Sequence, residues 1–147
     1  MNIKRAYITE VTLITADEAR RLPAQVLKGS CWWWTRSPGF FQAEPTVAYV
    51  NGSGMVMPAG TAVNDFNGAV RPVLVIGELI DVAGVKVGDE VSVEDIGPAV
   101  YIGNHKVLLG SVGYSRYDGR SAEFDGSAIK RWLKKWWDEL PKRRRHG

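Results

Sequence analysis

The stretch Trp32-Trp33-Trp34-Thr35-Arg36-Ser37-Pro38-Gly39 places three indole rings next to one another. On a helix, three successive rings would spread around the axis, whereas on a strand successive side chains point to opposite faces. We therefore predict a strand in which Trp33 points away from Trp32 and Trp34, so that both faces must be covered by other elements. Ser37-Pro38-Gly39 predicts a turn directly afterwards.

The residues before the tryptophans predict a strand followed by a short helix. Residues 3–14 alternate in polarity and are rich in β-branched types, which is typical of a strand. Thr15-Ala16-Asp17-Glu18 has the spacing of a capping box, in which Thr15 caps the helix and Glu18 stands three positions on. We expect this helix to run through about Leu22 and to stop at Pro23.

The residues after the tryptophans predict a series of strands. Residues 47–50 and 55–57 form a hairpin pattern around Asn51-Gly52-Ser53-Gly54. Residues 69–80 supply a further apolar strand, interrupted by Pro72, which suits a strand start or an edge. From Asp81 onward, glycine-rich turns separate three short strands, expected at 90–93, 99–102 and 106–109.

The C-terminal region carries the clearest periodicity in the chain. Its apolar residues recur at helical spacing: Ile129, Trp132, Leu133, Trp136, Trp137 and Leu140. Asp125 or Ser127 can cap this amphipathic helix, and Pro141 is expected to follow its end. The elements together predict an α+β fold of small twisted antiparallel sheets with two helices. We expect a single domain over residues 1–141 and a basic tail over 142–147. Residues 77–88, which we call the seam, are the only stretch at which this domain could divide into two halves.

Length and composition set the broad class of the protein. The chain has 147 residues, of which 45% are hydrophobic, and it contains a single cysteine, Cys31. These values predict one globular domain and exclude global disorder. No apolar run approaches the ~18 residues of a membrane-spanning helix, and the first residues do not form a secretion signal. One cysteine permits no internal disulfide and no cysteine-based metal cluster, so a reducing, cytoplasmic location is predicted.

Three blocks of the first half resemble a known family. They are residues 32–39, residues 48–54 and the segment Gly68-Ala69-Val70-Arg71-Pro72-Val73-Leu74. Over roughly residues 10–80, the chain resembles uncharacterised bacterial and phage domains whose signature is an aromatic-rich W-x-R-S-P-G strand and a G-V-R-P-A-L closing strand. The departures are Thr35, where that family usually has leucine, and Ala69, an extra residue. The resemblance implies a C-type-lectin-like fold, shared with sulfatase-modifying proteins.

The second half resembles the same family in a different order. Residues 87–91, 107–109, 114–117 and 126–133 resemble the half that normally precedes the signature, but here they follow it. We therefore hypothesise a circular permutation of the usual order, which would be natural if the two termini lie close together. Separate cores for residues 1–80 and 81–147 would refute this hypothesis.

The sequence contains few residues that could form a catalytic or metal site. His105 and His146 are the only histidines, and neither stands at metal-ligand spacing from Cys, Asp or Glu. Catalysis in the sulfatase-modifying relatives depends on cysteines in a region that this chain does not match. Residues 44–46 and 64–67 are oxygen-rich loops, but they offer few carboxylates for a calcium–glycan site. We expect no catalytic residues, no metal and no cofactor, and hence a protein that is not an enzyme.

Aromatic loops are the leading candidates for a binding surface. Phe40 and Phe41 follow the predicted turn, and Tyr114 and Tyr117 flank Arg116. Aromatic and arginine side chains are the usual anchors of interfaces. The leading hypothesis is a recognition domain that binds a protein or small ligand through these loops, and the resemblance suggests a phage or prophage origin. Local packing of the same rings is the alternative.

Two further arginines, Arg36 and Arg71, lie within apolar strands, where an unpaired charge is costly. We expect both to be structural, paired with carboxylates such as those of Asp17, Glu18 or Asp89, or with backbone carbonyls.

The basic residues suggest a second function. The polar face of the C-terminal helix carries Lys130, Arg131, Lys134 and Lys135, and the tail adds Lys142, Arg143, Arg144 and Arg145. Without the four tail charges the net charge of +3 falls to −1, so the basicity is local. These residues predict, as the alternative function, association with nucleic acid through counterion release. An anionic membrane surface, an acidic protein partner or a merely solvated helix face are the other interpretations.

Overall fold

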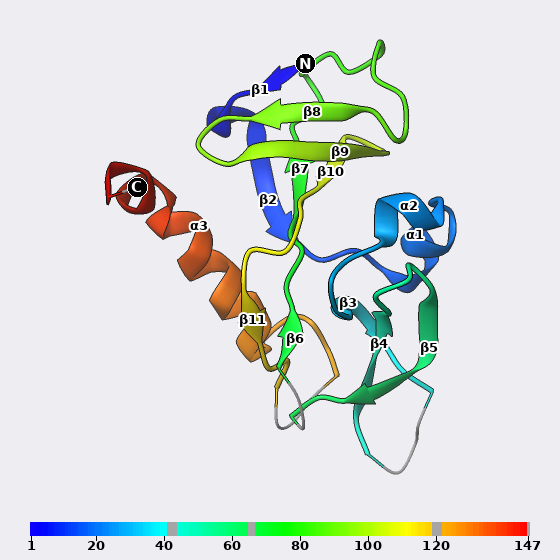
Figure 1. Ribbon diagram of the computed structural model, residues 1–147. Coiled ribbons are helices and arrows are strands. Elements are labelled where there is room, and N and C mark those ends of the chain that lie inside the picture. Colours follow the sequence, from blue (N-terminus) through cyan, green and yellow to red (C-terminus); the bar gives the residue numbers. More distant parts are fainter. Residues whose placement is uncertain (41–43, 65–66, 119–121, 147) are drawn as a thin grey trace.

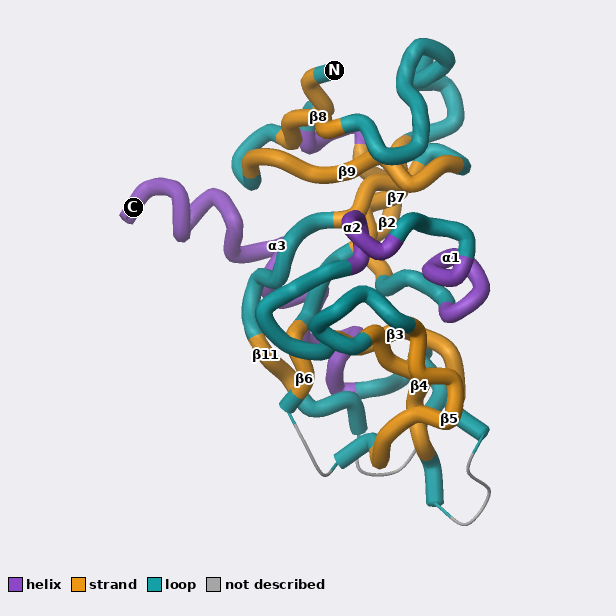
Figure 2. The backbone as a smooth tube through the Cα atoms, turned by 45° about the vertical axis from the view of Figure 1, so that its right-hand side comes forward, coloured by secondary structure: helices purple, strands orange, loops and turns teal. Residues whose placement is uncertain are grey.

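A computed structural model describes residues 1–40, 44–64, 67–118 and 122–146, with side chains described up to Leu140. It confirms an α+β architecture of two curled sheets and a few helices (Figure 1). The two sheets lie one above the other (Figure 2). Each contains one parallel pair of strands, so the sheets are mixed and not purely antiparallel as expected.

The six-stranded sheet has the order β1 (Asn2–Ile3), β8 (Glu90–Val93), β9 (Gly97–Gly103), β10 (Lys106–Leu108), β7 (Val73–Ile76) and β2 (Ile8–Thr12). The five-stranded sheet has the order β11 (Tyr114–Ser115), β6 (Gly68–Ala69), β3 (Trp33–Pro38), β4 (Thr46–Val50) and β5 (Val56–Ala62). The strands expected at 90–93, 99–102 and 106–109 and the hairpin at 47–57 are therefore present. Residues 69–80 instead contribute β6 and β7 to different sheets, with Arg71 and Pro72 between them.

The tryptophan strand is β3, and its two faces are covered as predicted. Trp33 and Trp34 are both fully buried, but in different core clusters. The indole of Trp33 donates a hydrogen bond to the carbonyl of Leu27 at 3.0 Å, and that of Trp34 donates to the carbonyl of Ser115 at 2.7 Å. The strand continues through Pro38, so the chain turns later than expected.

The first fourteen residues form two short strands in place of the one expected. A 3-10 helix, η1 (Arg5–Tyr7), separates β1 from β2, and these strands occupy opposite edges of the same sheet. In a flat sheet, five inter-strand spacings would place the edges about 24 Å apart. The chain from Ile3 to Ile8 spans at most about 17 Å. The six-stranded sheet must therefore curl until its edges approach each other, around a core that includes Ile3 and Leu74.

Three α-helices complete the described part of the chain, one more than expected. Helix α1 (Ala16–Arg20) has the predicted capping box of Thr15 and Glu18. Helix α2 (Ala24–Leu27) follows Pro23 and was not foreseen.

Helix α3 (Ala128–His146) packs along both sheets through the predicted apolar face (Figure 1). Its cap is Ser127, whose hydroxyl accepts from the N–H of Lys130 at 3.3 Å. The expected end at Pro141 was wrong, because the helix continues to His146. None of the helices in the described ranges is long and apolar enough to cross a membrane.

The cores unite both halves of the chain. Leu74 and Ile76, which precede the seam at 77–88, pack in one cluster with residues that follow it, namely Val91, Val107 and Trp136. Residues 1–80 and 81–147 therefore do not form separate cores. The circular permutation stays a hypothesis.

Candidate functional site

The aromatic residues predicted to bind a partner lie in different environments. Phe40 follows β3 and is 69% exposed, and Tyr114 on β11 is 59% exposed. Arg116 is also exposed. Tyr117, in contrast, is 0% exposed, and its ring packs edge-on against Trp34 at 5.3 Å between centroids. Tyr117 is therefore part of the core and not of a surface, while Phe41 lies outside the described residues.

The exposed aromatic residues do not gather at one place. Tyr114 lies opposite Ala69, which in turn pairs with Trp33 at the start of β3. Phe40 lies beyond the other end of β3, where its N–H donates to the carbonyl of Ala59. Seven residues of nearly extended chain span roughly 20 Å. Phe40 and Tyr114 are thus exposed at two separate places on the surface.

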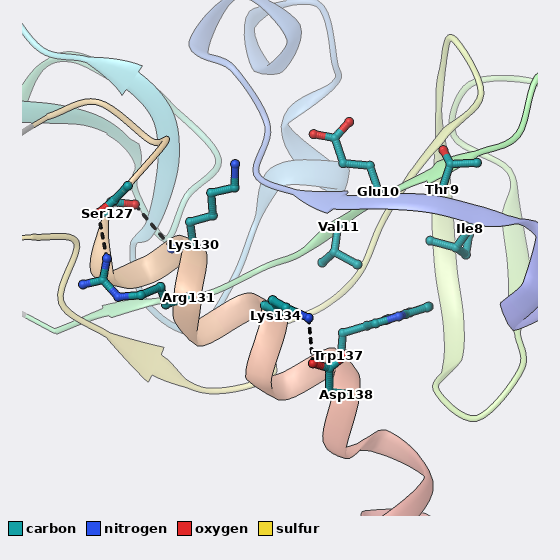
Figure 3. Close-up of a pocket in the computed structure, with 11 residues that line it drawn as sticks. Ile8, Thr9, Glu10, Val11, Ser127, Lys130, Arg131, Lys134, Trp137 and Asp138 are labelled. Carbon is teal, nitrogen blue, oxygen red and sulfur yellow. Dashed lines mark hydrogen bonds and ion pairs between the residues drawn. The ribbon is translucent and has the colours of Figure 1, made fainter.

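The predicted basic face of α3 borders a cavity of about 380 Å³, which we call the β2–α3 pocket. One wall is α3 with the residues just before it, and the other wall is β2 (Figure 3). Lys130, Arg131 and Lys134 line it, whereas Lys135 does not. Three of the four basic helix residues predicted from the sequence are thus brought to one concave site.

The strand wall of the pocket is an exposed sheet edge. Four consecutive residues, 8–11, line the cavity. Because neighbouring residues of a strand face opposite sides, such a run must include the backbone edge as well as one face. Among the described strands, β2 is the last of its sheet and pairs with β7 alone. Its outward backbone N–H and C=O groups are therefore directed away from the ladder.

The apolar part of the pocket is formed by Ile8, Val11 and Trp137. Val11 points from β2 toward α3, and the indole of Trp137 extends beneath the strand (Figure 3). The guanidinium of Arg5 lies 4.5 Å from the centroid of the Trp137 ring and donates to the carbonyl of the same residue at 2.6 Å. The cation–π contact orders the indole, and the hydrogen bond fixes the backbone that carries it, so the apolar surface is preformed.

The cations of the pocket differ in how far their charge is balanced. Lys130 pairs with Asp125 at 2.5 Å, and Lys134 pairs with Asp138 at 3.0 Å. The Lys130 contact lowers the pKa of Asp125 below its usual range. Arg131 donates from Nη1 to the carbonyl of Gly126 at 2.7 Å and forms no ion pair with any described carboxylate. Arg131 is therefore the cation of the pocket best able to bind a carboxylate of a ligand.

The two strand arginines find neutral partners. Arg36 donates to the Thr12 hydroxyl at 2.7 Å and lies 4.7 Å from the ring centroid of Phe124. Arg71 donates to the carbonyls of Leu109 and Val26. Arg71 has the expected backbone carbonyls, and neither arginine forms an ion pair with a carboxylate among the described residues.

The described histidine side chain and the single cysteine both lie outside the β2–α3 pocket. His105 lies in the β9–β10 turn with φ of 58°, and its Nδ1 is 3.3 Å from the carbonyl of Gly77. Cys31 is half-buried, with its Sγ 3.9 Å from the Tyr114 hydroxyl. Within the described ranges, no group of three or more His, Cys, Asp or Glu residues is arranged to hold a metal ion. Residues 142–145 continue α3, but their side chains lie outside the described part.

Sequence reasoning identified the helix wall of the pocket and missed the strand wall. The alternation of residues 3–14 signals a strand but does not tell whether its edge is paired. The only signal of an exposed edge in the sequence was the pair of adjacent polar residues Thr9 and Glu10 within that strand.

Comparison with known proteins gives a family without a function. The model of a family described as "Domain of unknown function (DUF6273)" matches residues 3–78, just over half of the 147 residues. Searches of curated proteins and of solved structures found no match to the chain.

Proposed function

We propose that this chain, which belongs to the DUF6273 family of domains of unknown function, is a non-catalytic recognition domain that binds an extended, acidic segment of a partner protein in the β2–α3 pocket. The observation that carries this proposal is the pocket wall formed by four consecutive residues of the edge strand β2. A bound segment would add a strand to that edge.

The backbone of β2 supplies the general part of the recognition. An unpaired sheet edge offers alternating donors and acceptors to any extended chain, and addition of a strand to such an edge is a recurrent mode of peptide binding. These bonds do not depend on the sequence of the peptide. Selectivity must therefore come from the side chains around the edge.

Two features of the pocket supply that selectivity. Ile8, Val11 and Trp137 form an apolar surface suited to one aliphatic or aromatic side chain of the ligand. Arg131, which has no described carboxylate partner, suits an aspartate or glutamate of the ligand, because arginine binds carboxylates through two parallel hydrogen bonds. Since side chains of a strand alternate, the preferred ligand combines apolar and acidic residues.

The resemblance of residues 10–80 to bacterial and phage domains of C-type-lectin-like fold supports a binding role. A phage- or prophage-derived domain that recognises a host protein is part of this proposal. Phe40, Tyr114 and Arg116 remain candidate contacts for a partner that extends beyond the pocket.

Selection from a phage-displayed library of random seven-residue peptides tests the proposal. We expect enrichment of peptides in which apolar and acidic residues alternate. Arg131→Glu should weaken the selected peptides about tenfold or more, because a charge-assisted contact becomes a repulsion. Lys135→Glu is the matched control, since Lys135 is exposed on the same helix but outside the pocket, and it should bind almost as the parent chain does. Failure to enrich any motif, or equal binding by Arg131→Glu, would contradict the proposal.

Association with nucleic acid is the second candidate, and one observation favours it. Helix α3 continues through the basic residues 142–145, and its C-terminal end reaches away from the two sheets (Figures 1 and 2). A projecting basic helix suits a phosphate backbone. Fluorescence anisotropy with duplex DNA and single-stranded RNA, at low and moderate salt, should then show binding that is lost on truncation after Leu140. In that case Arg131→Glu and Lys135→Glu would weaken binding equally. Absence of binding at low salt would exclude this class.

A further inference from the structure

We propose that a second cavity, built around Arg71, binds a small oxyanion. The cavity has a volume of about 200 Å³ and shares no lining residue with the β2–α3 pocket. Its polar lining comes from Lys28, Ser30, Cys31, Arg71 and Ser111. No acidic residue lines it, in contrast to the β2–α3 pocket, which contains Glu10 and Asp138.

The charge of Arg71 is buried and uncompensated. The residue is only 8% exposed, and no described carboxylate forms an ion pair with it. Burial lowers the pKa of Arg71 to about 10, so the guanidinium is still charged at neutral pH. A buried cation without a counter-charge is costly, and an anion in the adjoining cavity would remove that cost.

The guanidinium is also held in a fixed orientation. Nε donates to the carbonyl of Leu109 at 2.8 Å, and Nη1 donates to the carbonyl of Val26 at 3.1 Å. The Arg71 Cζ atom lies 4.7 Å from the ring centroid of Trp33, which is itself fully buried. Two of the five N–H groups of an arginine are thus used, and three are left for a ligand. Because the side chain is already ordered, binding an anion costs little further conformational entropy.

The rest of the cavity suits a compact anion. Lys28 is exposed and lines the cavity, so it adds a second positive charge. The hydroxyls of Ser30 and Ser111 can donate to further oxygens. A volume of about 200 Å³ is enough for a phosphate or a small carboxylate.

Isothermal titration calorimetry of the full chain with sodium phosphate and, separately, with sodium acetate tests the inference. Saturable binding of either anion supports it, and the stronger of the two identifies a tetrahedral or a planar ligand. Lys28→Ala should weaken binding roughly tenfold. Lys86→Ala removes an exposed lysine outside the cavity lining and should leave binding unchanged.

A carboxylate introduced into the cavity by substitution gives a second test of the anion site. Gly110 lines the cavity, has no positive φ, and a Cβ added to it meets nothing within 4 Å. Gly110→Asp should therefore fold, raise the melting temperature by pairing with Arg71, and abolish anion binding. Anion binding that Gly110→Asp abolishes and that persists in Arg131→Glu is thereby assigned to this cavity and not to the β2–α3 pocket. No saturable binding of either anion, or full phosphate binding by Gly110→Asp, would overturn the inference.

Discussion

A single arginine explains why α3 continues past a proline. Pro141 has no N–H, so the carbonyl of Trp137, four positions earlier, lacks its helical donor. Arg5 supplies the missing donor through Nη2 at 2.6 Å. The same guanidinium stacks on the Trp137 ring and lies 3.9 Å from a carboxylate oxygen of Asp95. A contact 132 positions away in sequence thus overrides a local stop signal.

A double-mutant cycle tests this explanation. Arg5→Ala should cost about 2 kcal/mol, because it removes a hydrogen bond from a charged donor and a cation–π contact. In a Pro141→Ala background the cost should fall by about 1 kcal/mol, since an alanine at that position restores the helical N–H donor to the carbonyl of Trp137. Urea unfolding of the four proteins measures both values. Strictly additive effects would show that Arg5 does not replace the missing N–H.

Glu18 makes stability depend on pH. Burial alone would raise its pKa, but hydrogen bonds from Lys106 at 2.8 Å and from the Thr15 N–H at 2.9 Å outweigh burial and lower the pKa below 4.5. A group with a lowered pKa in the folded state stabilises the fold above its unfolded pKa. This stabilisation is lost as the pH falls through the folded value.

Glu18→Gln isolates that charge, because glutamine can still accept from the Thr15 N–H. We expect the variant to be about 1 kcal/mol less stable than the parent at pH 6 to 7, and the difference to shrink below pH 4.5. Urea unfolding across this pH range measures the difference. A gap that is constant with pH would indicate a packing effect instead of the ion pair with Lys106.

At the scale of elements, the sequence patterns that proved reliable are local ones. The capping box at Thr15, the opposed rings of Trp33 and Trp34, and the periodicity from Ile129 to Leu140 each depend on a few neighbouring residues. Strand pairing, in contrast, does not depend on neighbouring residues alone. The assignment of β6 and β7 to different sheets, and of β1 and β2 to opposite edges, is decided by distant partners.

Strand β6 is short and tightly enclosed, which gives a test of its packing. A Cβ at Gly68 would lie 2.5 Å from the indole nitrogen of Trp34 and 2.7 Å from a ring carbon of Trp32. Gly68→Ala should therefore destabilise the protein by about 2 kcal/mol through overpacking. Gly84→Ala is the control, because nothing lies within 4 Å of its added Cβ and its φ is not positive. Equal melting temperatures for the two variants would contradict this packing.

At the scale of the whole molecule, the family segment and the rest of the chain depend on each other. Of the six-stranded sheet, the segment 3–78 contains only β2, β7 and the second residue of β1. It lacks β10, which pairs with both β7 and β9, and α3, which contributes residues to two of the core clusters. The candidate site likewise needs both parts, since β2 and α3 come from opposite ends of the chain. This is why the sequence predicted its cations but not the pocket.

A fragment tests this dependence. We expect residues 1–80 alone to be unfolded, because Leu74 and Ile76 would lose Val91, Val107 and Trp136 from their cluster. The amide region of a heteronuclear NMR spectrum should then be narrow. Adding the separately prepared residues 81–147 should restore dispersion if the two pieces assemble. A dispersed spectrum of the first fragment alone would show that it is an independent unit.

We propose that an extended acidic segment adds to the free edge of β2. Amide hydrogen exchange of the full chain, with and without the tightest peptide from the selection, tests it most directly. We predict slower exchange over residues 8–12 in the bound state, with residues 106–108 at the centre of the same sheet unchanged. Protection that avoids β2 and falls elsewhere, such as around Phe40 or Tyr114, would contradict the claim and move the binding surface to those aromatic residues.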